Sequence, residues 1–190
     1  MSWTRSIPVA EAGPALAPMY ESIRARSSRG RVSNLWLALG SDPAALASTD
    51  ASYRALVRDP APLTAAQAEL IALVVSATNG CGYCVAHHGP ALATTLGDER
   101  LARAVAMDYR TADLAARDRV LLDHCVALTC EPAERTRADI ERVREYGFDD
   151  AGIVKATAIA AYYNHVNRLV SSLGVELEHD VPVWEFGTQV

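Results

Sequence analysis

The spacing of apolar residues along the chain predicts a protein built from helices. Between residues 14 and 26, Leu16, Met19, Tyr20 and Ile23 recur at the spacing of one helix face. Glycines, prolines and N-capping residues divide the rest of the chain into further helical segments. These segments are residues 34–39, 43–58, 64–77, 81–96, 98–107, 114–129, 133–146 and 150–173. No segment shows a convincing strand pattern, so we predict an all-α fold.

The length and composition favour one helical domain. The chain has 190 residues, of which 50% are hydrophobic and only 6% aromatic, so Ala, Leu and Val supply most of the apolar content and favour helices. This length suffices to bury a core without disulfides or metals. We therefore expect a single all-helical domain over residues 1–190, with an N-terminal arm and helix at 1–30, a core at 31–174 and a tail at 175–190.

The tail and the apolar content predict a homo-oligomer. The tail carries Trp184 and Phe186, which need a surface to cover, either on this subunit or on a neighbouring one. A hydrophobic fraction of 50% in a chain of this length also favours association between subunits.

The net charge and the absence of a long apolar run exclude several classes of partner. A formal charge of −5 argues against nucleic acid or an anionic membrane as the main partner. No run of 18 uncharged apolar residues occurs, so no transmembrane helix is expected. The N-terminus lacks an apolar stretch of signal-peptide length. We expect a cytoplasmic protein.

One predicted helix is apolar on every face and carries a single ionisable residue. Thr64 and Gln67 form a capping box, and the run from Ala68 to Ala77 that follows contains Glu69 as its only charged side chain. Such a helix is buried all round. Desolvation raises the pKa of a lone buried carboxylate, which makes it a candidate for general acid–base catalysis. The simpler interpretation is that Glu69 is a first-turn acid that stabilises the helix dipole.

Two cysteines, Cys81 and Cys84, begin the next helix. In a reducing compartment a Cys-x-x-Cys pair indicates redox chemistry or metal binding. On a helix that starts near Cys81 the two thiols share one face, and a Cα separation of about 5 to 6 Å suits a disulfide. The backbone N–H groups of the first turn should depress the pKa of Cys84, and to a lesser degree that of Cys81.

Two histidines follow the cysteine pair on the same helix. His88 is four residues after Cys84 and His87 three after it, so an imidazole can reach the Cys84 sulfur and exchange a proton with it. A zinc site would need two ligands besides the cysteines, and His87 or His88 could supply only part of that set. Taken alone, His88 also fits a core histidine with satisfied hydrogen bonds.

Packing of the two helices as a hairpin connects Glu69 to this histidine. Asn79-Gly80 ends the first helix, and antiparallel packing about this turn sets His88 level with Ala72. Glu69 is then one turn away, at an axial offset of about 4 to 5 Å that its side chain can span directly or through one water. We predict a proton relay from Glu69 to His88 to Cys84, with Cys81 behind Cys84.

The four residues together carry a family resemblance. Glu69, Cys81, Cys84 and His88 match the spacing E-x11-C-x2-C-x3-H, which resembles the alkylhydroperoxidase D family within the carboxymuconolactone decarboxylase superfamily. The sequences of three further segments are similar to those of the family branch of peroxidase-related proteins. These segments are residues 34–36, 69–76 and 161–169. The resemblance covers about residues 30 to 175.

The resemblance implies an all-helical, oligomeric thiol peroxidase without a cofactor. Cys84 would be oxidised by a peroxide to sulfenic acid, Cys81 would resolve it, and Glu69 and His88 would assist proton transfer. An unidentified dithiol or reductase would supply the electrons. One position departs from the family pattern: the best-known members have a histidine directly before the second cysteine, and this chain has Tyr83. Slower peroxide turnover or a different electron donor would follow.

Two other functions remain open at this point. A thiol–disulfide reductase without peroxidase activity would use the same dithiol. A decarboxylase-type lactone enzyme fits less well, because decarboxylases of the superfamily usually lack the Cys-x-x-Cys pair. The third possibility, from a different class, is a non-enzymatic metal-binding or oligomeric scaffold protein.

Polar and thiol side chains elsewhere have less defined roles. Cys125 and Cys130 are five residues apart and do not form a helical Cys-x-x-Cys pair, so we expect core cysteines. Asn164, His165 and Asn167 lie on the apolar last helix, where buried polar groups must find partners. They would line either the active-site pocket or an oligomer interface.

Overall fold

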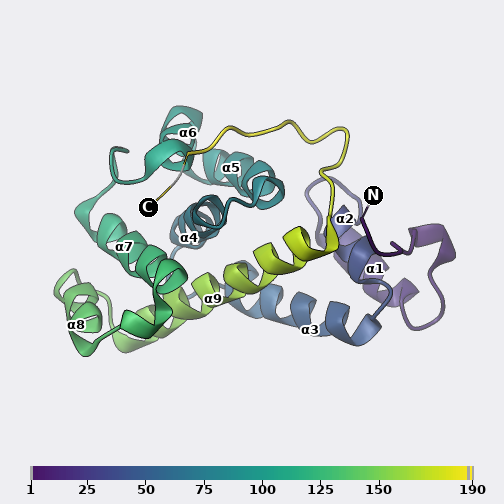
Figure 1. The fold of residues 1–190 in the computed structure, drawn as a ribbon, viewed down its shortest axis with the longest axis horizontal. Coiled ribbons are helices and arrows are strands. Elements are labelled where there is room, and N and C mark those ends of the chain that lie inside the picture. The colour runs from purple at the N-terminus through teal and green to yellow at the C-terminus, as the bar shows by residue number, and fades with distance from the viewer. Residues whose placement is uncertain (1, 188, 190) are drawn as a thin grey trace.

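The computed structural model describes residues 2–187 and 189, and within these residues it contains helices and no strand (Figure 1). The helices are α1 Ala17–Arg26, α2 Asn34–Leu39, α3 Pro43–Tyr53, α4 Ala65–Thr78, α5 Gly82–Leu96, α6 Glu99–Asp108, α7 Ala116–Cys130, α8 Arg137–Glu145 and α9 Asp150–Leu173. A π-helical turn, η2 Arg54–Arg58, extends α3, and 3-10 turns form at Val9–Glu11 and Pro132–Glu134. The all-α prediction is confirmed.

The predicted helix boundaries differ from the structure mainly at helix starts. Helices α2 and α9 have the expected limits. Helix α8 begins four residues later than expected, at Arg137, because Pro132–Glu134 forms a separate turn. Thr136 then starts α8, and its backbone N–H donates to Asp139 Oδ2 at 2.7 Å. Local hydrogen bonds of this kind, rather than hydrophobic spacing, set where a helix starts.

Helix α4 is the central helix, as its apolar sequence predicts. The Thr64 hydroxyl accepts a hydrogen bond from the Gln67 N–H, and the Gln67 side chain accepts one from the Thr64 N–H, which closes the capping box. Every residue from Leu70 to Ala77 is buried, and α5, α6, α7 and α9 pack around the helix. Among the described residues, no helix combines the length and apolarity needed to cross a membrane.

A short turn joins α4 to α5 and places the cysteines. Gly80 has a φ of +68°, in the left-handed region that glycine adopts at little cost. The Cys81 N–H donates to the Ser76 carbonyl oxygen at 2.9 Å, which continues the end of α4 into the turn. Cys81 is the N-cap of α5, so Cys84 falls in its first turn. The predicted position of the cysteine pair at a helix start is confirmed.

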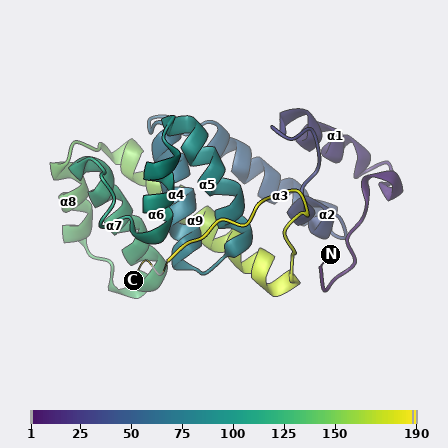
Figure 2. The same cartoon turned by 90° about the horizontal axis from the view of Figure 1, so that it is seen from above.

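The tail after α9 runs back over α5 to α6 of the same chain (Figures 1 and 2). Trp184 is buried, and its ring lies so close to Gly89 that a Cβ at Gly89 would come within 2.5 Å of it. The Arg103 guanidinium stacks 4.0 Å from the centroid of the same ring, and the Gly187 N–H donates to the Ala106 carbonyl at 3.1 Å. Trp184 therefore covers its own subunit, and homo-oligomerisation stays a prediction.

Candidate active site

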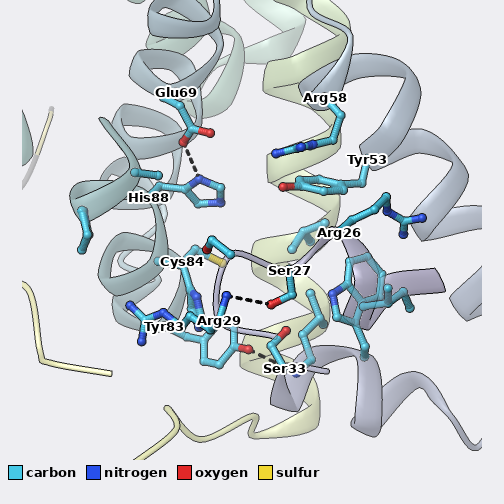
Figure 3. Close-up of a pocket in the computed structure, with 18 of the residues that line it drawn as sticks. Arg26, Ser27, Arg29, Ser33, Tyr53, Arg58, Glu69, Tyr83, Cys84 and His88 are labelled. Carbon is cyan, nitrogen blue, oxygen red and sulfur yellow. Dashed lines mark hydrogen bonds and ion pairs between the residues drawn. The ribbon is translucent and has the colours of Figure 1, made fainter. Parts of the chain in front are cut away.

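Glu69 and His88 contact each other between α4 and α5, as the hairpin argument predicts. The Nδ1 atom of His88 lies 2.8 Å from Oε2 of Glu69, and the two side chains are 15% and 18% exposed. Figure 3 shows His88 between Glu69 and Cys84. An ionised carboxylate can only accept a hydrogen bond, so Nδ1 carries the proton. The Nε2 atom of the neutral ring is then free to act as a base.

The two cysteines occupy different positions relative to the cavity at this site. Both are free thiols and each is only 3% exposed. Cys84 lines the cavity together with Glu69 and His88, whereas Cys81 is not part of the lining. A small molecule in the cavity therefore meets Cys84 first.

The order of acidity of the two thiols is the reverse of the sequence-based expectation, which lowered the pKa of both but that of Cys84 more. The hydrogen bond between the thiols raises the pKa of Cys84 well above its ordinary value, and burial raises it further. The same hydrogen bond lowers the pKa of Cys81 despite its burial, with help from the Cys84 backbone N–H and the Asn167 side chain. The expected depression at Cys84 is wrong because the helix-terminus argument left out the hydrogen bond between the two buried thiols.

A network of amides behind the cysteines ties α9 to the turn before α5. Asn79 Nδ2 donates to the side-chain oxygens of Asn164 and Asn167, at 3.0 and 2.9 Å. Asn167 Nδ2 donates in turn to the Ser76 hydroxyl at 3.1 Å. Neither Asn164 nor Asn167 lines the cavity, and His165 is exposed outside it. The two asparagines hold the turn that positions the cysteines.

The cavity has a volume of about 540 Å³ and two unlike walls. Figure 3 shows Glu69, His88 and Cys84 on one side, and Arg26, Tyr53 and Arg58 on the other. The first wall comes from α4 and α5, and the second from α1, α3 and η2. Cys84, His88 and Glu69 thus face a cationic and aromatic surface across the cavity.

Tyr163 from α9 covers the His88 ring and is a site residue that sequence reasoning missed. The two rings meet edge to face, with centroids 4.8 Å apart and an interplanar angle of 82°. Tyr163 lines the cavity, and its buried hydroxyl has no hydrogen-bond partner among the described residues. Burial raises the pKa of this hydroxyl well above its ordinary value. It remains a hydrogen-bond donor for a molecule that enters the cavity.

Glu178 in the tail is the second site residue that the sequence did not indicate. Its carboxylate accepts hydrogen bonds from the Tyr83 hydroxyl at 2.9 Å and the Asn34 N–H at 2.7 Å, and lies 2.9 Å from His87 Nε2. Burial raises the pKa of Glu178, but the contacts with His87 and Asn34 outweigh this and lower the pKa to about 2. Tyr83, the departure from the family pattern, is therefore held by the tail.

The other cysteines lie away from this site. Cys125 is fully buried, as expected, and burial raises its pKa to about 12. Cys130 is exposed at the end of α7, so the expectation of a core cysteine is wrong there: the last turn of α7 emerges from the core. Among the described residues, no three His, Cys, Asp or Glu side chains are grouped closely enough to hold a metal ion.

Several solved structures resemble this chain over most of its length. An uncharacterised peroxidase-related protein from Silicibacter sp. TM1040 is 31% identical, with 92% of this chain and 91% of that chain covered and a TM-score of 0.84. An alkylhydroperoxidase AhpD core from Ralstonia eutropha JMP134, also an uncharacterised peroxidase-related protein, is 28% identical, with 95% and 94% covered and a TM-score of 0.87.

The debrominase Bmp8, solved as a cysteine-to-alanine variant with 2,3,4-tribromopyrrole, shares the fold at 18% identity, with 92% of this chain and 91% of that chain covered and a TM-score of 0.78. No curated protein matches the sequence.

Residues 43–121, which span α3 to the first part of α7, match the model of the carboxymuconolactone decarboxylase family. Together with the 31% identity over nearly all of both chains, this match shows that the chain belongs to the carboxymuconolactone decarboxylase superfamily, among its alkylhydroperoxidase D-like proteins.

Proposed function

We propose that this protein is a thiol-dependent peroxidase that reduces hydrogen peroxide or organic hydroperoxides through a Cys81/Cys84 dithiol–disulfide cycle. The observation that carries the proposal is the shared cavity wall, on which a thiol, an imidazole and the carboxylate that orients it lie together. Each group has a role in peroxide reduction, which needs a thiolate nucleophile and a proton donor for the leaving oxygen.

The first step oxidises Cys84. His88 Nε2 takes the Cys84 proton, and the Sγ atom attacks the terminal oxygen of the hydroperoxide. The S–O bond forms as the O–O bond breaks, and His88 returns the proton to the leaving oxygen, which departs as an alcohol or as water. Glu69 stabilises the imidazolium that exists between the two proton transfers. Cys84 is left as sulfenic acid.

The second step forms the disulfide. The Cys81 thiol gives up its proton and its sulfur attacks the Cys84 sulfur. The S–S bond forms as the S–O bond breaks, and the leaving hydroxide takes up the proton from Cys81 and departs as water. The lowered pKa of Cys81 suits this role, because a resolving cysteine must be a thiolate when it attacks. The depressed thiol pKa therefore supports assignment of Cys81 as the resolving cysteine.

The cycle closes when an external dithiol reduces the Cys81–Cys84 disulfide and is itself oxidised to a disulfide. This requirement fits a reducing compartment such as the cytoplasm. A reductase acting on protein disulfides is the competing function, and it needs an accessible cysteine. Because each cysteine is only 3% exposed while Cys84 faces a cavity, a small-molecule substrate fits better.

The test is single-turnover oxidation of the fully reduced protein by cumene hydroperoxide without oxygen. Wild type should consume one equivalent, lose two thiols and give a Cys81–Cys84 disulfide by peptide mass spectrometry. Cys81→Ser should stop at a sulfenic acid that dimedone traps on Cys84, and Cys84→Ser should not react. Cys125→Ser, away from the cavity, is the matched control and should behave as wild type.

Two results would overturn the proposal. Consumption of hydroperoxide by Cys84→Ser at the wild-type rate would remove Cys84 from the reaction. A wild-type protein that reduces insulin disulfides but neither cumene hydroperoxide nor hydrogen peroxide would be a thiol–disulfide reductase.

A further inference from the structure

The cavity is cationic although the chain as a whole is anionic, with a net charge of −5. Its lining holds four arginines and two acidic residues, which are Arg26, Arg29, Arg31, Arg58, Asp50 and Glu69. Two of the arginines are paired, Arg26 with Asp50 at 2.5 Å and Arg31 with Asp180. Neither Arg29 nor Arg58 forms an ion pair within residues 2–187 and 189, and the Arg58 side chain hydrogen-bonds the Tyr53 side chain. No carboxylate among the described residues is therefore paired with Arg58.

Arg58 is placed to meet a ligand. It ends the π-helical turn η2, a distortion that is frequent at functional sites, and Figure 3 shows its guanidinium pointing into the cavity toward the wall of Glu69 and His88. Burial and the charge of Glu69 raise the pKa of the Tyr53 hydroxyl, and the neighbouring Arg58 opposes this change. The guanidinium is thus held beside an aromatic ring on the wall opposite the nucleophile.

The size of the cavity argues for an organic substrate. A volume of about 540 Å³ is many times the space that hydrogen peroxide fills, since one water molecule takes up about 30 Å³ in the liquid. Trp36 and Tyr53 meet edge to face with centroids 6.3 Å apart, and both line the cavity. These rings give the cavity an apolar surface beside its charged groups.

We propose that the preferred substrate is an organic hydroperoxide that also carries a carboxylate, and that Arg58 binds this carboxylate while the hydroperoxide group lies against Cys84 and His88. The inference rests on the proposed peroxidase function. An arginine fork holds a carboxylate with two parallel hydrogen bonds, which would fix the opposite end of the molecule against the sulfur. The unpartnered Tyr163 hydroxyl supplies a donor to the substrate on the side of His88.

The test compares cumene hydroperoxide with its para-carboxylate derivative, and also the two unreactive alcohols formed from them. Wild type should bind the carboxylate alcohol at least about tenfold more tightly by calorimetry, and show a similar preference in kcat/KM between the hydroperoxides. Arg58→Gln should abolish both preferences, and Arg58→Lys should keep part of them. Arg137→Gln, a 91% exposed arginine on α8, removes the same charge and should leave the preferences intact.

The binding and kinetic measurements separate the two proposals. The protein could prefer the carboxylate alcohol in an Arg58-dependent way and yet reduce no hydroperoxide. This result would support the anion site and overturn the proposed peroxidase function. Equal wild-type affinity for the two alcohols would overturn the anion site alone. If Arg58 only balances the charge of Glu69, Arg58→Gln would change the affinity for both alcohols by the same factor. This result would also overturn the anion site.

Discussion

The Nδ1 atom of His88 lies 2.8 Å from the carboxylate of Glu69, a residue nineteen positions earlier on the neighbouring helix. This contact fixes which ring nitrogen carries the proton and keeps the other one basic. In the proposed mechanism the base is therefore a pair, because His88 alone would have neither a defined tautomer nor a counter-charge when protonated.

Replacing Glu69 with Gln tests this pair. The amide keeps the shape of the side chain but cannot neutralise an imidazolium, so the reaction of Cys84 with hydroperoxide should slow by about a hundredfold or more, as should that of His88→Ala. Stopped-flow rates from pH 5 to 9 would show this, with circular dichroism as the check on folding. Superimposable pH profiles for wild type and both variants would mean that neither residue assists the thiol.

The order of thiol acidity gives a second prediction. The hydrogen bond from Cys84 lowers the pKa of Cys81, so Cys84→Ala should raise the pKa of Cys81, whereas Cys84→Ser, which keeps a donor, should raise it less. Thiolate absorbance in the ultraviolet, followed during a pH titration of the two variants, measures the difference. Identical titrations would show that burial and the helix terminus, not the neighbouring thiol, set the acidity of Cys81.

Glu178 should make the protein sensitive to acid. Its pKa is about 2 in the folded protein against an ordinary value of 4.5, so the unfolded chain takes up the proton first as the pH falls. The stabilisation is complete above about pH 5 and is lost between about pH 4.5 and pH 2, with a full size of up to about 3 kcal/mol.

Urea unfolding of wild type and Glu178→Gln at pH 7 and pH 3 checks this prediction. Wild type should lose more of its free energy of unfolding at pH 3 than the variant does. Glu185→Gln, at an exposed position on the same tail, is the control and should follow wild type. Equal pH dependence in wild type and Glu178→Gln would contradict the pKa assigned to this carboxyl.

Hydrophobic periodicity and capping residues were enough to predict the helices and the first half of the site. The capping box at Thr64, the turn at Gly80 and the distance along two antiparallel helices are local properties, and they place Glu69 beside His88 without any knowledge of the rest of the chain. The helix-terminus argument failed for the thiols because it treated Cys81 and Cys84 as independent groups, whereas burial couples them.

Only the tertiary structure decided what covers this hairpin. Glu178 reaches Tyr83 across 95 residues of sequence, and nothing in the polar tail distinguishes it beforehand. Arg58 and Tyr163 come to the cavity from η2 and α9, which meet α5 only when the helices pack. Such contacts depend on the relative placement of whole helices, which long-range packing sets and local periodicity does not encode. The sequence alone therefore predicted that Glu69 and His88 lie together near Cys84, and the fold determined which residues form the opposite wall of the cavity.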